Sequence, residues 1–391
     1  MAGEGDENYL TTAEVARRLQ VKPATVYAYV SRGMLTSVRA RGRRGSLFAA
    51  AEVERLAGRS VEHSGVVERI ESQLTLLEDD ELYYRGHPVR TLATTSTVEQ
   101  VAHLLWSTEP VREFGVDRGR VQLARVGMGV VGEGRLTDLL RVGVAVLGAA
   151  DPLRFDLSTG SVTGAAGQLI GNLIAALPGP IAINTTLGGR LWPKLSNNQS
   201  SQPGPTDAEV LDAALILLAD HGLAVSTIAA RVAASARANL YAVISAGLGA
   251  LDGQYHGAAP TLAYEFLDRA KQDPLKALSD QLRSGEPIPG FGHKIYQQRD
   301  PRAEVLLGML GDHPIMETVT AIADRTTTFP NSDLAIAAIM HAYDFRPDAG
   351  DALFALARMI GWTAHALEEY AAPALRFRAL GVYTGPTSLQ A

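Results

Sequence analysis

The chain has 391 residues, of which 46% are hydrophobic and 20% charged, a composition typical of folded proteins rather than disordered or repetitive ones. It contains no cysteine, which excludes disulfides, a thiol nucleophile and cysteine-based metal sites. At this length we expect more than one domain. The acidic start lacks the apolar run of a secretory signal, and no apolar stretch has the length of a membrane helix. We therefore expect a cytoplasmic protein that does not contact the membrane.

The charge is unevenly distributed along the chain. The net charge is −6, but residues 1–60 carry +4 and the remainder carries −10. A basic head on an acidic body indicates two tasks, one of which could lie near phosphate groups.

The first 60 residues predict two short helices joined by a tight turn. Thr11 and Glu14 have the spacing of a capping box, so a helix should begin after Thr11 and run through Leu19. Pro23 suits the first position of a second helix that ends at Gly33. In that helix we expect three residues to face inward: Val26, Tyr27 and Val30. A hairpin over residues 36–40 and 46–49 and a third helix over residues 51–57 should follow, which completes a winged helix-turn-helix.

Residues 9–57 resemble the MerR/excisionase-type helix-turn-helix family over its whole length. In such a module the second helix fits the major groove of DNA, and arginines of the wing pair with phosphates. The candidate DNA contacts are Thr25, Tyr29 and Arg32 on the second helix and Arg39, Arg41, Arg43 and Arg44 on the wing. The alternative is a docking or dimerisation module with a solvated basic edge.

From about residue 61 the apolar periodicity predicts a mainly α fold built from long helices. We expect helices over residues 97–106, 164–176, 207–219, 228–246 and 351–370, and strands over residues 73–77 and 82–84. The segment 187–205 is polar and rich in Gly, Pro, Asn and Ser, which predicts a mobile loop.

Three segments of this body combine histidine or aspartate with glycine or a helix start. GQYHGAA places His256 between glycines, IPGFGHKIY places His293 after a glycine-rich turn, and FPNSD ends in Asp333 at a predicted helix start. Taken singly, each has a structural explanation, such as a core histidine or a helix cap. Taken together, they point to one site.

The run IPGFGHKIYQQRDPRAEVL is similar to the signature of the citrate synthase family. The same family is echoed, in family order and at family spacing, by LYYRGHPVRTLA, LADHGLAVSTIAARV, GLGALDGQYHGAAP, FPNSD and LFALARMIGWTAHALEE. The resemblance covers about residues 62–391. It implies a two-domain, all-helical body, with a large domain over 61–251 and 351–391 and a small domain over 252–350. The helix-turn-helix module would occupy residues 1–60.

The resemblance also implies a reaction, the condensation of a short acyl-CoA with oxaloacetate. Asp333 matches the base that takes a proton from the thioester, and His256 matches the donor to the enol oxygen. His293 matches the residue that polarises the ketone of oxaloacetate. The matches for binding oxaloacetate are His221, Arg302, Arg358 and Arg376, and Lys294 would meet the phosphates of CoA. Neither a metal nor a resident cofactor is implied, since acetyl-CoA or propionyl-CoA is a cosubstrate.

In the family the arginine matched by Arg376 reaches in from the partner subunit, so the resemblance implies a homodimer. The sequence departs from the family pattern at several positions. Ala224 stands where the family has asparagine, and an apolar run, Leu334–Ala337, follows Asp333 and should raise its pKa. Three functions therefore stay open: a citrate synthase, a 2-methylcitrate synthase that uses propionyl-CoA, and a catalytically weak ligand sensor that binds DNA.

Overall fold

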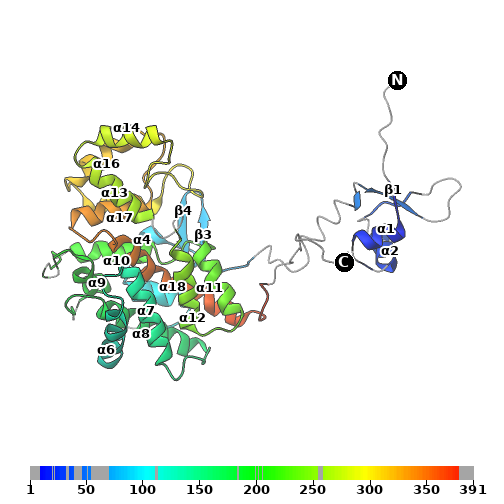
Figure 1. Ribbon diagram of the computed structural model, residues 1–391, viewed down its shortest axis with the longest axis horizontal. Helices are drawn as coiled ribbons and strands as arrows, with labels where there is room; N and C mark the ends of the chain where they lie inside the picture. Colours follow the sequence, from blue (N-terminus) through cyan, green and yellow to red (C-terminus); the bar gives the residue numbers. More distant parts are fainter. Residues whose placement is uncertain are drawn as a thin grey trace, which may run out of the picture. The chain divides into compact units, whose positions relative to one another are not determined.

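The computed structural model describes residues 9–19, 21, 23–31, 35–38, 46–50, 52–53, 70–110, 113–182, 185–198, 200, 202–204, 206–253 and 259–377. The chain divides into two compact units, one formed by Met1–Glu71 with Leu375–Ala391 and the other by Ser72–Ala374. Figure 1 labels the elements of both units.

The first unit is small and begins with the predicted capping box. Its elements are β1 (Tyr9–Thr11), α1 (Thr12–Arg18), α2 (Pro23–Ser31) and β2 (Leu47–Ala49). The Thr11 side chain accepts from the backbone of Glu14, and the Thr11 N–H donates to the Glu14 carboxylate at 2.7 Å. The two strands pair antiparallel. The hydrophobic core of this unit consists of Val15, Ala16, Leu19, Val26, Leu35, Phe48 and Val53.

One expectation for this unit needs correction. Tyr27 does not face inward, because its side chain is 54% exposed. Residues 26 and 30 share a helix face, whereas residue 27 lies about 100° away from residue 26 around the helix. The predicted hairpin is described only in part: Val38 and Leu47 form an antiparallel bridge, residues 39–45 lie outside the described ranges, and β2 also pairs with β1. Of the predicted helix at 51–57, only residues 52–53 are described.

The second unit begins with a small antiparallel sheet in the order β3-β4-β5. The strands are β3 (Thr75–Glu78), β4 (Glu81–Tyr84) and β5 (His87–Pro88). Glu78 pairs with Glu81 across a two-residue turn whose residues, Asp79 and Asp80, have φ angles of 50° and 56°. Left-handed backbone at both positions suits the twist of a tight hairpin. The strands predicted at 73–77 and 82–84 are confirmed within two residues.

The rest of the second unit is helical, which confirms the mainly α prediction. The helices are α4 (Val89–Thr95), α5 (Val98–Trp106), α6 (Arg118–Gly129), α7 (Leu136–Ala149), α8 (Thr159–Ala176), α9 (Leu187–Leu195), α10 (Asp207–Leu217), α11 (Val225–Ser235), α12 (Leu240–Leu251), α13 (Ala259–Ala270), α14 (Pro274–Ser284), α15 (Pro301–Leu310), α16 (Ile315–Ala323), α17 (Ser332–Ala342) and α18 (Ala349–Ala371).

The long helix α18 is the centre of this unit. Its residues from Ala349 to Ala366 are all buried, and it packs against helices α5, α7, α8, α10, α11 and α12. Helices α13, α14, α16 and α17 pack around one another and lie together at the top of Figure 1. They fall within the predicted small domain, residues 252–350, but the division of the body into large and small domains stays a prediction.

The segment predicted as a loop at 187–205 starts with a buried helix instead. In α9 all nine residues are buried, and the Thr186 hydroxyl caps the helix by accepting from the Gly189 N–H at 3.2 Å. Leu191, Trp192 and Leu195 fill the core with at most 2% of each side chain exposed. The apolar spacing of these residues outweighs the Gly and Pro content that suggested a loop.

The helix predicted over 228–246 is two helices, α11 and α12. Arg237 interrupts it with a left-handed backbone, φ 59°. Asn239 then starts α12, because its side-chain oxygen accepts from the Ala242 N–H at 3.1 Å. An asparagine cap inside an apolar pattern was the signal for this break.

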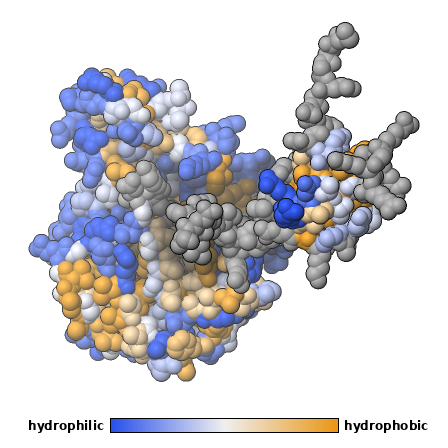
Figure 2. All heavy atoms as spheres, turned by 45° about the vertical axis from the view of Figure 1, so that its right-hand side comes forward, coloured by the Kyte–Doolittle hydropathy of each residue, from blue (hydrophilic) through white to orange (hydrophobic). Residues whose placement is uncertain are grey.

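Apolar side chains also reach the surface of the second unit. Figure 2 shows them gathered on its lower part, where Figure 1 places α6, α7 and α8. Val126 and Val130, on and next to α6, are 62% and 87% exposed. None of the helices in the described part of the chain combines the length and apolarity that a membrane span requires.

Candidate active site

Two of the predicted histidines meet in the second unit. His221 lies in the turn between α10 and α11, and His293 lies in the loop before α15. Their ring centroids are 5.2 Å apart with the rings nearly perpendicular, at 82°. Tyr296 joins them, with its hydroxyl 2.9 Å from Nε2 of His221 and its ring centroid 4.8 Å from that of His293.

Asn331 fastens the His293 loop to the start of α17, which carries Asp333. Its side-chain amide donates to the Gly292 carbonyl at 2.9 Å, and its side-chain oxygen accepts from the Asp333 N–H at 2.9 Å. Its own N–H donates to the Gly290 carbonyl at 2.9 Å. Gly290 has a φ of 81°, and a Cβ there would lie 2.7 Å from Cβ of Leu334. Only glycine fits this approach, so His293 and Asp333 are mounted on one bonded unit.

Burial shifts the pKa values of Asp333 and His293 in the directions that favour their neutral forms. Burial raises the pKa of Asp333 to about 6, with help from the charge of Asp300, although Arg302 and Arg358 oppose the rise. Burial and the charge of Arg302 lower the pKa of His293 to about 4. At pH 7 Asp333 is therefore an ionised carboxylate of raised basicity, and His293 is neutral.

The neutral ring of His293 has a defined tautomer. Its Nδ1 accepts from the backbone N–H of Ile295 at 3.1 Å and lies 3.4 Å from that of Tyr296. Since Nδ1 accepts, the ring proton is on Nε2, where it can be donated to a ligand. Burial also lowers the pKa of His221 well below its usual range, with the charges of Arg302 and Arg358 acting in the same direction.

Arg302 reaches the site from the first turn of α15. It is 3% exposed, and its guanidinium lies 5.4 Å from the ring centroid of Tyr296. Asp300 accepts from its Nε at 3.0 Å and from its Nη2 at 2.8 Å. The same carboxylate accepts from the Ser332 N–H at 2.9 Å, which ties the start of α15 to the start of α17.

Arg358 reaches the site from the middle of α18 and lacks such a partner. It is 2% exposed, and its Nε and Nη1 have no hydrogen-bond partner within the part of the chain that the structure describes. Burial lowers its pKa, and Asp220 supplies the principal opposing charge. Buried N–H groups left open are costly, so they indicate a ligand with acceptor oxygens.

The sequence matches the family model for citrate synthase, C-terminal domain, over residues 65–378, and a helix-turn-helix domain model over residues 9–59. This chain belongs to the citrate synthase family. The citrate synthase of Mycolicibacterium smegmatis is 29% identical over 345 residues, which are 79% of this chain and 90% of the relative. The 2-methylcitrate synthase 1 of Corynebacterium glutamicum is 30% identical over 354 residues, with 79% and 90% covered.

The fold agrees with a solved citrate synthase, that of Thermoplasma acidophilum in a ternary complex with carboxymethyl coenzyme A and oxaloacetate. The TM-score is 0.69 at 22% sequence identity, and the match covers 83% of this chain and 96% of that chain. Among the described residues, no three histidine, aspartate or glutamate side chains converge as a metal site.

Of the other residues predicted for the site, one is exposed, one belongs to the other compact unit, and one lies outside the described residues. Lys294 follows His293 and is exposed. Arg376 belongs to the unit that contains Leu375–Ala391, and its guanidinium lies 4.9 Å from the ring centroid of Phe377. His256 lies outside the described residues.

The candidate DNA contacts are only partly described. Thr25 and Tyr29 are half-buried on α2, and Tyr29 packs against the small core. Five of the candidate arginines lie outside the described residues: Arg32, Arg39, Arg41, Arg43 and Arg44.

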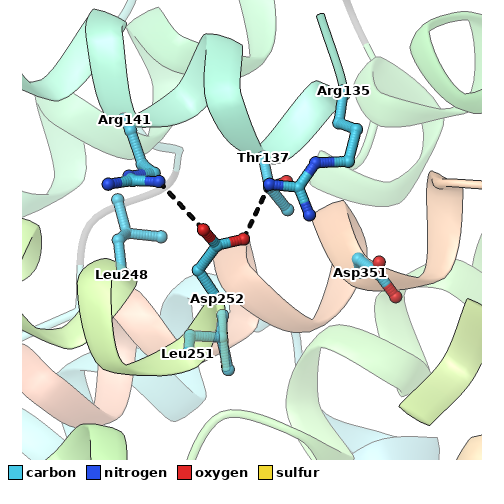
Figure 3. A pocket seen from close by; sticks show the side chains of 7 residues that line it. All are labelled: Arg135, Thr137, Arg141, Leu248, Leu251, Asp252 and Asp351. Carbon is cyan, nitrogen blue, oxygen red and sulfur yellow. Dashed lines mark hydrogen bonds and ion pairs between the residues drawn. The ribbon is translucent and has the colours of Figure 1, made fainter. Parts of the chain in front are cut away.

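Asp252, the residue that precedes the segment with His256, forms two ion pairs. Figure 3 shows Asp252, at the end of α12, between two arginines of α7 and its N-terminal flank. Its carboxylate lies 2.7 Å from Nη2 of Arg135 and 3.1 Å from Nη1 of Arg141. Asp351 of α18 lines the same pocket and accepts from the Thr261 hydroxyl at 2.9 Å. These contacts fix the point where the chain leaves α12, four residues before His256.

Sequence reasoning missed Tyr296, Asp300 and Asn331. A signal existed for Asp300, because Asp followed by Pro301 marks a helix cap and a first helical residue. A cap was also readable at Asn331. No sequence pattern predicts the hydrogen bond between Tyr296 and His221, which lie 75 residues apart in the chain.

Proposed function

We propose that this chain condenses a short acyl-CoA with oxaloacetate and water, which yields CoA and citrate, or 2-methylcitrate where the acyl group is propionyl. The observation that carries the proposal is the pair of open N–H groups on buried Arg358, beside Arg302 and two neutral histidines. Such a group of side chains suits a small dianion, because guanidinium N–H groups donate strong, charge-assisted hydrogen bonds to carboxylate oxygens.

Oxaloacetate would place separate carboxylate oxygens at Nε and Nη1 of Arg358, because these two N–H groups lie on different edges of the guanidinium. Its ketone oxygen would accept from Nε2 of His293, whose other nitrogen is held by backbone N–H groups. This hydrogen bond polarises the ketone carbon for attack and becomes stronger as negative charge develops on the oxygen.

Asp333 would take the proton from the carbon next to the thioester carbonyl. A pKa near 6 leaves the carboxylate ionised at pH 7 and makes it a stronger base than an exposed aspartate. The enol carbon then attacks the ketone carbon, and a new carbon–carbon bond forms. Water finally cleaves the thioester and releases CoA. His256, as the donor to the enol oxygen, stays a prediction.

The acyl group is not decided by these residues. The relatives include both citrate and 2-methylcitrate synthases at similar identity. One methylene changes the preference of an apolar pocket by only about 1–3 kcal/mol. The ratio of the rates with acetyl-CoA and propionyl-CoA would decide it.

The test is CoA release, followed with a thiol-reactive dye, which cannot react with a chain that has no cysteine. The wild type should turn over, and Asp333→Ala and Asp333→Asn should be slower by about 10³-fold or more, because the base is lost. Both variants should still bind oxaloacetate in calorimetry. Asp280→Ala, at an exposed carboxylate paired with Lys276, is the control and should keep the full rate. Normal turnover by Asp333→Asn would remove the base assignment.

The homodimer and its contribution of Arg376 to the partner's site also stay proposals. The exposed apolar side chains on and next to α6, Leu123, Val126 and Val130, support an interface on that side.

A second candidate function is favoured by the match to a helix-turn-helix domain over residues 9–59 and by the positive charge of this segment. We infer that the module binds DNA and that oxaloacetate or acyl-CoA in the body modulates this binding. A gel-shift with the chain's own promoter region, with and without each ligand, tests it. No shift at low salt would leave docking as the role of the module.

A further inference from the structure

The turn that carries His221 is held from several sides. The Tyr84 hydroxyl donates to the Asp220 carbonyl at 2.8 Å and accepts from the Asp220 N–H at 2.9 Å. Gly361 of α18 donates its N–H to the Ala219 carbonyl at 3.1 Å. These bonds fix the backbone on the N-terminal side of His221, and the Asp220 side chain extends the restraint.

The Asp220 carboxylate is fully buried and uses both oxygens. Oδ2 accepts from the Thr75 hydroxyl at 2.5 Å and from the Gly222 N–H at 3.0 Å. Oδ1 lies 3.2 Å from Nε2 of His365 on α18. Burial pushes the pKa of Asp220 upward, but the interactions with His365 and Arg358 and the hydrogen bond from Thr75 outweigh it, so the pKa falls. Asp220 is therefore a buried anion at pH 7.

His365 connects this anion to Arg231 of α11, a helix that packs against α18 (Figure 1). Nδ1 of His365 lies 2.6 Å from Nη1 of Arg231. A guanidinium can only donate, so Nδ1 accepts and the ring proton is on Nε2, directed at Asp220. Arg231 is held in turn by Glu369 at 2.6 Å and by Glu368 at 2.7 Å. The orientation of the His365–Asp220 bond is thus set by Arg231.

We infer that Asp220 and His365 are positioning residues for oxaloacetate, a role that rests on the proposed function. They hold the His221 turn against α18, so that the His221 ring faces His293 and Tyr296. Asp220 also supplies a negative charge for Arg358 without occupying Nε or Nη1 of that arginine. Those N–H groups remain available for the substrate. A buried ionic chain is weak evidence for stability, since apolar packing often serves as well, but it fixes a geometry.

Two amides at position 365 test this inference. The amide of glutamine can occupy the place of Nε2 and donate to Asp220, whereas the shorter asparagine reaches only the place of Nδ1. His365→Asn should raise the Kd and KM for oxaloacetate by about tenfold or more, because a hydrogen bond to a charged group is lost. His365→Gln should stay within about threefold of the wild type, and kcat and the acyl-CoA KM should change little in both.

Thr363→Val is the matched control on the same helix. Thr363 is fully buried, and within the described residues its hydroxyl bonds only to the Met359 carbonyl of its own helix, at 2.7 Å. It should leave the Kd for oxaloacetate unchanged. If His365→Asn does not fold, Thr75→Val removes the bond to the other Asp220 oxygen and should weaken oxaloacetate in the same direction.

The outcomes separate the inference from the proposed function. A wild type that binds oxaloacetate, with equal Kd values for the Asn and Gln variants and equal losses of melting temperature, would assign His365 a purely structural role and overturn the inference alone. A wild type that binds no oxaloacetate in calorimetry would overturn both. If the wild type binds oxaloacetate but does not turn over, the oxaloacetate Kd values of His365→Asn and His365→Gln still decide the inference.

Discussion

The start of α15 and the middle of α18 each bring one buried arginine to the candidate site, and the two regions treat it differently. Arg302 is paired with Asp300 through two hydrogen bonds. Arg358 keeps two N–H groups open within the described residues. The desolvation of Arg302 is compensated within the protein by Asp300. The desolvation of Arg358 would be compensated fully only by a bound ligand. We therefore expect Arg302 to serve stability and binding, and Arg358 to serve binding.

The largest effect is expected for Arg302→Met. It leaves Asp300 buried without its cation, which should lower the free energy of unfolding by about 3–5 kcal/mol and weaken oxaloacetate as well. Urea unfolding measures the first effect and calorimetry the second. Arg283→Met, at a side chain 78% exposed, is the control and should stay within about 0.5 kcal/mol. If Arg302→Met unfolds at the same urea concentration as the wild type, Arg302 does not contribute to stability and the contrast with Arg358 is wrong.

Arg358→Met should have the opposite profile. It should weaken oxaloacetate by roughly 100-fold, since a buried pair of charge-assisted hydrogen bonds is lost. The unliganded protein should be as stable as the wild type or more so, because burial disfavours the charged form of Arg358 and Arg302 repels it. Calorimetry and urea unfolding of the same preparation check both statements. A loss of stability equal to that of Arg302→Met would mean that the two arginines do not differ.

The smallest effect concerns pH. The wild-type kcat/KM should fall about tenfold per pH unit below about pH 6, because Asp333, with its pKa raised to about 6, must be ionised to act as a base. His293, at about 4, stays neutral over this range. Arg358 lowers the pKa of Asp333, so Arg358→Met should move the acidic limb to higher pH by a fraction of a unit. An acidic limb centred near 4 in the wild type would contradict the assignment.

Local signals in the sequence predicted much of this arrangement. The caps and glycines around Asp333 and His293 act over a few residues, and the fold, the helix start at Asp333 and the raised pKa of its carboxyl all followed from them or from the family resemblance. The partners that hold the site did not. His365 and Asp220 lie 145 residues apart in the chain, and no periodicity reports such a contact. Composition also misled, because the glycines and proline of α9 hid a buried helix.

The contact between Gly361 and the Ala219 carbonyl has a consequence for how this protein can vary. A Cβ at position 361 would lie 2.3 Å from that oxygen, closer than atoms can approach without moving the backbone. Every substitution there must push α18 away from the turn that bears His221. Position 361 has no side chain, yet it limits how the candidate site can evolve or be engineered. A library that varies this position should yield only glycine among its functional members.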